Sequence, residues 1–111
     1  MDLLTEVRSI SERKQEEFKD ILATKLPNII ELIDKELFKE AERGYRSFNF
    51  VVRHLDAYTE DQELRTFGYN AEQTTRRALL KHLSAHYRKI GFKTGGNWEV
   101  DATEMTIRWD K

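Results

Sequence analysis

The chain contains no cysteine. This absence excludes disulfide bonds, thiolate metal sites and thiol catalysis, and it removes the usual cross-link of a small secreted domain. No apolar run approaches the roughly 18 residues that a membrane-spanning helix needs. The first residues, MDLLTEVRSISERK, carry acids where a signal peptide would carry bases before an apolar stretch. We therefore expect a cytoplasmic protein that has no membrane partner.

Proline is nearly absent, and no glycine-rich or serine-rich linker divides the 111 residues. A chain of this length matches one domain, so we expect a single domain over residues 1–111. The composition, 39% hydrophobic and 35% charged, provides a thin core under a strongly charged surface.

Acidic residues are missing from one long segment. Residues 1–72 hold 11 Lys or Arg against 16 Asp or Glu, whereas residues 73–98 hold six basic residues and no acid. Residues 99–111 return to two basic residues against four acids. The net charge of −1 therefore hides an uneven distribution, which bears on the choice of partner.

Two helices are expected in the first 44 residues. The sequence SISE (Ser9 to Glu12) is a capping box, which predicts a first helix with a packing stripe and a frayed start of about eight residues. Pro27 suits the first turn of a second helix, which Gly44 would end in a left-handed conformation. The stripe of the first helix comprises Ile10, Phe18, Ile21 and Leu22, and that of the second Ile30, Ile33, Leu37 and Ala41, supported by Ile29 and Phe38.

The remaining pattern adds strands to helices. Phe48, Phe50 and Val52 alternate with polar residues, as on a strand with one buried face. Residues 60–67 could form a short helix before Gly68, and a long helix would then run from a cap at Asn70 to Gly91. Two strands should follow as a hairpin, one with Trp98 and Val100 and one with Met105, Ile107 and Trp109, turning at residues 101–103 or at residues 95–97. The class is α+β, with N-terminal helices, one strand, a long basic helix and a C-terminal β-hairpin.

The long helix separates apolar from basic residues. On a helical wheel, Leu79, Leu83, Tyr87 and Ile90 share one side, and Arg77, Lys81, Ser84 and Arg88 share another, extended by Lys89. One interpretation is a face that binds phosphates, with Gln73, Thr74 and Thr75 at its first turn. The other is a solvated face whose charges are neutralised by the acidic N-terminal helices, which is the commoner origin of a charge run.

The order of elements and the segment LRTFGYNAEQTTRRALLKHL resemble the winged-helix DNA-binding family over residues 64–100. In bacterial repressors of that family, a glycine turn precedes a polar cap and a T-x-R-x-A-L-x-x-L pattern. The resemblance implies that Thr75, Arg76, Arg77 and Lys81 face DNA, while Ala78, Leu79 and Leu83 pack inside.

Four other segments resemble small accessory proteins encoded by bacteriophages. These are AERG at the end of a helix, the strand FNFVV, the helix end YRKIGF and the last strand TIRW. Many such proteins have no assigned activity, so the resemblance implies a viral origin and a binder of a host or phage macromolecule.

Catalytic and metal-binding patterns are sparse. His82 and His86 lie four residues apart, as two ligands of one metal on a helix would, but no cysteine or intervening glutamate accompanies them. Glu99 and Asp101 could pair for acid-base or metal chemistry on one face of a strand, or could simply be its solvated face. Phosphate-binding loops and nucleophile elbows are missing. We expect no enzyme activity, no cofactor and no metal, with a metal-dependent hydrolase as a remote alternative.

The sequence thus favours a non-catalytic domain that binds nucleic acid, namely DNA, through its basic helix. The alternative is a phage-type accessory protein that binds and modulates a host or phage protein. In that alternative, the same face meets an acidic protein surface, or the acidic N-terminal helices mediate association. Pairing of the first helix with a second copy, giving a homodimer, stays open. The predicted nucleic-acid-binding residues are Thr75, Arg76, Arg77, Lys81, Arg88, Lys89 and Lys93.

Overall fold

A single helix, α1 (Leu3–Glu42), replaces the two N-terminal helices that we expected. The computed structural model describes residues 2–110. The helix begins at Asp2, whose carboxylate accepts a hydrogen bond from the backbone N–H of Thr5 at 2.8 Å. Aspartate caps a helix as well as serine does, so the start lies seven residues before Ser9. The segment expected to fray is therefore helical.

Pro27 lies inside α1 and does not begin a second helix. An interior proline removes one backbone hydrogen bond and crowds the preceding turn. Burial of Phe18 before it and of Ile29 and Ile33 after it holds both halves of the helix against the body. This packing offsets the local cost. Gly44 follows the helix with a φ of +86°, which is the left-handed conformation predicted there.

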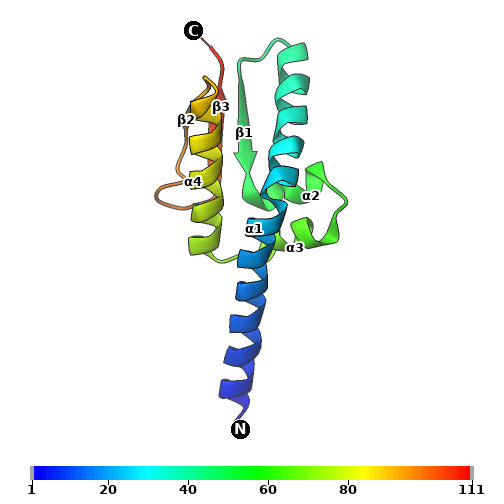
Figure 1. Ribbon diagram of the computed structural model, residues 1–111, viewed down its shortest axis with the longest axis vertical. Coiled ribbons are helices and arrows are strands. Elements are labelled where there is room, and N and C mark those ends of the chain that lie inside the picture. Colours follow the sequence, from blue (N-terminus) through cyan, green and yellow to red (C-terminus); the bar gives the residue numbers. More distant parts are fainter. Residues whose placement is uncertain (1, 111) are drawn as a thin grey trace.

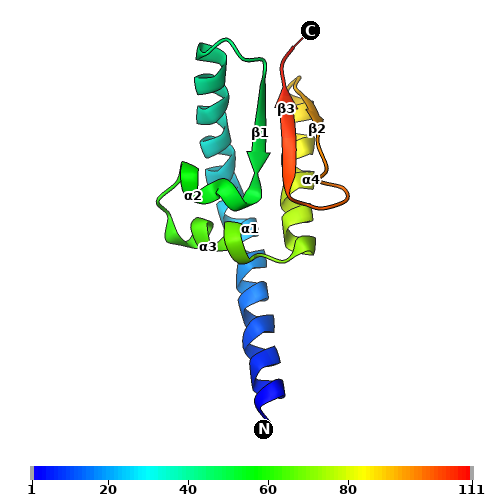
Figure 2. The ribbon, with the colours of Figure 1, turned by 180° about the vertical axis from the view of Figure 1, so that it is seen from behind.

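The other elements build two layers. In the antiparallel sheet, β3 lies between β1 and β2 and pairs with both. Figures 1 and 2 show α1 and α4 on one face of this sheet, with α2 and α3 beside α1. The protein is therefore an α+β protein. The elements after α1 are β1 (Ser47–Val51), the 3-10 turn η1 (Val52–His54), α2 (Leu55–Tyr58), α3 (Gln62–Asn70), α4 (Gln73–Lys89), β2 (Lys93–Gly95) and β3 (Glu104–Arg108).

The core lies between the helices and the sheet. Phe48, Phe50 and Val52 are buried, as the alternating pattern predicts. The opposite face of the sheet is polar, because Asn49 donates a hydrogen bond to Glu104 at 2.9 Å and accepts one from Thr106. Helices α1 and α4 cover only the apolar face. Ile10 and Phe38, both expected to pack, are instead 59% and 71% exposed.

Gly68 lies within α3 and does not form the turn expected before the long helix. A Cβ atom on Gly68 would lie 2.8 Å from the backbone oxygen of Val52 and 3.1 Å from Cβ of Leu55. The glycine is needed because α3 crosses η1 and α2 at this short distance. The sequence correctly indicated that a glycine is required at this position, but the reason is close packing and not a turn.

Helix α4 ends as predicted and begins differently. Gly91 follows it with a φ of +106°, which confirms the predicted stop. The expected cap, Asn70, is the last residue of α3, and the N-cap position of α4 belongs to Glu72, which makes no side-chain capping bond. Ile90, assigned to the core face, is 57% exposed, because the helix has already reached the edge of the body.

The hairpin has shorter strands and a longer loop than we expected. Residues 96–103 connect β2 to β3, so Trp98 and Val100 lie in the loop and not on a strand. Asn97 organises this loop: its backbone oxygen accepts from the N–H of Asp101 at 2.9 Å, and its side-chain oxygen accepts from Thr103 at 3.0 Å. The side-chain bonds of this asparagine stabilise a wide loop in place of a tight turn.

Candidate nucleic-acid interface

Helix α4 lies between α1 on one side and the β2–β3 hairpin on the other (Figures 1 and 2). Leu79, Leu80 and Leu83 are fully buried. Tyr87, also fully buried, donates a hydrogen bond through its hydroxyl to Oδ1 of Asp34 in α1 at 2.7 Å. Burial, and then the bond to this carboxylate, raise the pKa of Tyr87 well above its ordinary value. Because two neighbours cover α4, its buried surface is wider than a single apolar stripe.

Because α4 is covered on two sides, Thr75 cannot belong to the predicted interface. Thr75 is only 3% exposed, so the expectation that it faces DNA is wrong. Ser84, placed on the basic stripe by the helical wheel, is equally buried, and its hydroxyl lies 2.7 Å from that of Thr94 on β2. Both residues lie inside because the hairpin packs over a side of the helix that carries no strong apolar signal.

Three arginines of α4 hold the hairpin and its loop. Arg76 donates to the backbone oxygens of Ala102 at 3.1 Å and Ala71 at 2.8 Å. Burial, with a smaller contribution from the nearby Arg53, lowers its pKa. Arg77 donates to the oxygen of Val100 at 3.1 Å. The side chain of Arg76 therefore points toward the loop and away from any ligand on the outer face of α4.

Arg88 has a similar second role at the other end of the helix. Its Nε donates to Oγ1 of Thr94 at 2.7 Å, while its side chain stays exposed. Lys93, one residue before Thr94, is exposed too. The link from Arg88 to Thr94 thus places the basic end of α4 beside the first residue of β2.

The outer face of α4 carries two lysines with one small residue midway between them. Lys81 and Lys89 are exposed, and the exposed Ala85 lies midway between them, one turn from each. His82 is exposed next to Lys81. The eight residues from Lys81 to Lys89 correspond to about 12 Å along the helix axis. This face is therefore narrow, smooth and basic.

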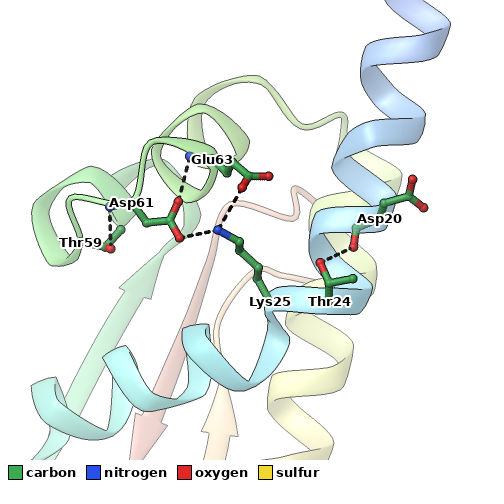
Figure 3. Close-up of polar contacts among 6 residues, drawn as sticks. All are labelled: Asp20, Thr24, Lys25, Thr59, Asp61 and Glu63. Carbon is green, nitrogen blue, oxygen red and sulfur yellow. Dashed lines mark hydrogen bonds and ion pairs between the residues drawn. The ribbon is translucent and has the colours of Figure 1, made fainter.

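The cations of α4 have no carboxylate partners among residues 2–110. Every ion pair found in that part of the chain lies within α1, joins α1 to its C-cap residue Arg43, or joins α1 to Asp61 and Glu63. Figure 3 shows the second kind, in which Lys25 of α1 contacts both of these acids at the start of α3. Five glutamates of α1 form ion pairs near their own position in the chain, and Asp34 accepts a hydrogen bond from Tyr87. Among the described residues, no acid of α1 forms an ion pair with a cation of α4.

The positive potential is concentrated in the C-terminal half of α4. Glu99 and Asp101, both exposed, flank Val100, whose backbone oxygen accepts from Arg77. These acids partly balance the charge at the N-terminal half of the helix. They lie in the loop, so the strand on which both interpretations of these acids placed them is wrong. Lys81, Arg88, Lys89 and Lys93 remain as the exposed basic group, which we call the α4 basic face.

His82 and His86 do not complete a metal site among the described residues, where no group of three or more suitable ligands occurs. His86 packs edge-on against Tyr87, with 4.8 Å between ring centroids. His82, considered in the sequence only as a metal ligand, lies on the α4 basic face. Its position seven residues before Lys89, which is about two helical turns, was the signal that could have assigned it there.

Among the described helices, none combines the length and the apolar character that crossing a membrane requires. Comparison of the chain with protein-family models, with curated proteins and with solved structures finds no match.

Proposed function

We propose that this protein is a non-catalytic domain that binds duplex DNA through the α4 basic face. The observation that carries the proposal is an exposed surface with four basic side chains, three on α4 and one at the start of β2, that have no carboxylate partner among the described residues. Lysine and arginine side chains of this kind displace counterions condensed on the phosphate backbone, and this displacement drives association.

The geometry of the face suits a DNA strand. Lys81 and Lys89 span about 12 Å along the helix, which corresponds to three or four nucleotides at roughly 3.4 Å per step. The small side chain of Ala85 between them lets the helix approach a groove closely, and the major groove of B-DNA admits an α-helix. The order of α1, β1, α3, α4 and the hairpin further supports a winged-helix arrangement as part of this proposal.

The salt dependence of DNA binding tests the proposal. We expect the wild-type protein to bind a 20-base-pair duplex of random sequence, with a slope of log affinity against log salt of roughly −3 to −4 for four phosphate contacts. As a control, excess heparin is added, a polyanion that competes with DNA for basic side chains. It should release the duplex from a soluble complex, and light scattering by the mixture reports any precipitation. Undetectable binding at 50 mM salt, with protein in the high micromolar range, would refute the proposal.

A second candidate function, binding of a protein, is favoured by a groove of about 390 Å³ at the opposite end of α1 from Asp2. Phe38, Ile90 and Trp109 line it, and an adjoining hollow that shares Trp109 is lined by Arg46. Charged residues of both signs border this surface: Asp34 lines the groove, Asp110 and Arg46 line the hollow, and Lys89 is next to Ile90 in the chain. The surface therefore fits an apolar segment that places an acidic residue near Arg46 or Lys89. This candidate corresponds to the phage-type accessory protein of the alternative hypothesis.

Replacing Phe38 by Glu separates the two functions. The side chain is largely exposed, so the substitution should leave the fold intact. If the protein binds DNA through the α4 basic face, the DNA affinity of Phe38→Glu should stay close to that of Phe38→Gln at equal salt. Under the second function, association with an acidic amphipathic peptide is lost in Phe38→Glu and retained in a Lys35→Glu control.

A further inference from the structure

The first 12 residues of α1 project beyond the rest of the molecule. In both ribbon views the blue part of the helix extends below every other element (Figures 1 and 2). The first hydrogen bonds that tie α1 to another element come from Gln15, whose side chain donates to the oxygen of Asn70 at 3.0 Å and accepts from the N–H of Glu72 at 2.9 Å. Residues 3–14, which we call the overhang, are all exposed.

The overhang carries an apolar stripe with no partner among the described residues. Leu3, Leu4, Val7 and Ile10 are between 50% and 76% exposed. Leu3, Val7 and Ile10 follow one another at intervals of four and three residues, which is the spacing of a helix-pairing seam. Lys14 continues the seam, and its ammonium group is drawn back toward the body by Glu17 at 3.0 Å. Burying apolar side chains at this spacing against another helix is more favourable than leaving them exposed to water.

We infer that this stripe binds a second copy of the chain, with the two overhangs antiparallel. The inference goes beyond the proposed DNA binding and does not depend on it. In the antiparallel alignment, Val7 of each copy faces Ile10 of the other, and Leu3 faces the aliphatic stem of Lys14. The overlap ends at Lys14, just before the body begins at Gln15, so two overhangs of about 18 Å fit together without collision.

Charge complementarity selects this orientation. Glu6 and Arg13 both lie on the same flank of the seam, one before Val7 and one before Lys14. When the helices are antiparallel, each Glu6 meets Arg13 of the other copy, and the two-fold symmetry forms this pair twice. When they are parallel, Lys14 meets Lys14 and Glu17 meets Glu17 across the seam. Like charges facing each other disfavour the parallel arrangement.

The size of the overhang sets the strength of the dimer. Stable interfaces bury on the order of 800 Å² on each partner, and a pair of three-turn helices buries less. We therefore expect a reversible dimer with a dissociation constant on the order of tens of micromolar. Such a dimer would form in the concentration range of sedimentation experiments.

The first test is the concentration dependence of the mass of the full chain, measured by sedimentation velocity from 5 µM to 1 mM. The wild-type mass should rise from 13.2 kDa toward twice that value. Ile10→Glu should stay monomeric, whereas Val100→Glu, which replaces an exposed apolar residue outside the overhang, in the loop between β2 and β3, should behave as the wild type. A wild-type protein that is monomeric at 1 mM overturns the inference, as does an Ile10→Glu variant that still dimerises.

The second test concerns orientation. Glu6→Arg and Arg13→Glu should each raise the dissociation constant about tenfold at low salt, because each places like charges opposite one another. An equimolar mixture of the two variants should form heterodimers close to wild-type strength, since both cross-pairs then carry opposite charges. Far-ultraviolet circular dichroism verifies that each variant is folded. If mixing restores nothing, the antiparallel arrangement is wrong.

Discussion

Helices α1 and α4 are both rich in basic residues, yet they handle charge in opposite ways. In α1, Lys14, Lys19 and Lys39 each pair with a glutamate three residues away. In α4, the basic residues either hold backbone oxygens of the hairpin loop, as Arg76 and Arg77 do, or face solvent. The charge of a segment therefore says little about a binding surface until the partner of each cation is known.

The two helices also expose different chemistry. The overhang of α1 exposes apolar side chains such as Leu3 and Val7, and α4 exposes lysines around Ala85. These surfaces suit different partners, because apolar stripes bury against other helices and basic faces attract phosphates. If the overhang pairs two copies, each dimer presents two basic faces, and binding at one raises the effective concentration of the other near DNA.

The largest predicted effect compares charge reversal on the two helices. Lys81→Glu with Lys89→Glu should weaken DNA binding by roughly 30-fold or more at 100 mM salt, because two phosphate contacts are lost and two repulsions are introduced. Lys35→Glu with Lys39→Glu changes the net charge by the same amount, but on α1. This control should lose far less affinity in a fluorescence-anisotropy titration. Equal losses in both variants would mean that net charge, and not the α4 basic face, governs binding.

The next effect concerns the bond that joins the two helices. Tyr87→Phe should lower the free energy of unfolding by about 1 to 2 kcal/mol, because it removes a hydrogen bond to a carboxylate. Tyr69→Phe, which removes the exposed bond to Asp56, is the matched control and should cost less. Urea denaturation followed by circular dichroism measures both. A larger loss in Tyr69→Phe would contradict the role assigned to Tyr87.

The burial of Tyr87, together with its bond to Asp34, predicts that stability depends on pH in the alkaline range. The pKa of Tyr87 is raised in the folded protein, so its contribution is fully present below about pH 10, the ordinary tyrosine value, and is lost as the pH rises through the folded pKa. The wild type should therefore lose stability above pH 10 more steeply than Tyr87→Phe does. Parallel stability curves of the two proteins between pH 9 and 11 would argue against this assignment.

A smaller effect is expected where α4 meets the hairpin. Thr94→Val removes the hydroxyl shared by Ser84 and Arg88 and leaves the buried Ser84 hydroxyl without this partner. We expect a loss of about 1 kcal/mol in the free energy of unfolding. Thr94→Ser keeps the hydroxyl and should recover most of this loss. DNA affinity should stay close to wild type in both variants, because Lys81 and Lys89 are unchanged; a strong loss in Thr94→Val would mean that Arg88 must be held to bind.

The sequence predicted helices and strands more reliably than the packing between them. The α+β class, the left-handed glycines after two helices and the buried face of β1 all follow from local signals, and the structure confirms them. Pro27 and Gly68 misled because packing of distant segments overrode their usual local effects. Proline is tolerated within α1 because flanking residues are buried, and Gly68 allows a close crossing instead of a turn.

The candidate site was only partly predictable for a related reason. A helical wheel assigns one buried face, whereas α4 is covered on two sides, so Thr75 and Ser84 were placed outside although they are buried. No periodicity reports that a loop folds back over a helix, as residues 96–103 do when Arg76 and Arg77 donate to them. The exposed lysines needed no such information, because their charge keeps them at the surface.

The smallest predicted effect concerns an ion pair that joins α1 to the start of α3. Lys25 is the α1 cation that contacts another element, where it bonds to Asp61 and lies 3.2 Å from Glu63 (Figure 3). Asp61 is also the N-cap of α3 and accepts from the N–H of Glu63. Asp61→Asn keeps an N-cap acceptor and removes the charge, whereas Asp61→Ala removes both and should cost about 1 kcal/mol more.

The pH dependence isolates the ion pair from the cap. The bond from Lys25 lowers the pKa of Asp61, so the stabilisation is present above about pH 4 and is lost as the pH falls through the lowered folded value. The same bond raises the pKa of Lys25, so the contribution is lost at the alkaline end only above pH 10.5. Wild type should therefore be more stable than Asp61→Asn at pH 7 and should approach it near pH 2. The difference should shrink in 0.5 M salt, because the pair is partly exposed. If the two unfolding curves stay parallel from pH 2 to 5, Asp61 acts only as a cap, and its ion pair with Lys25 contributes nothing measurable to stability.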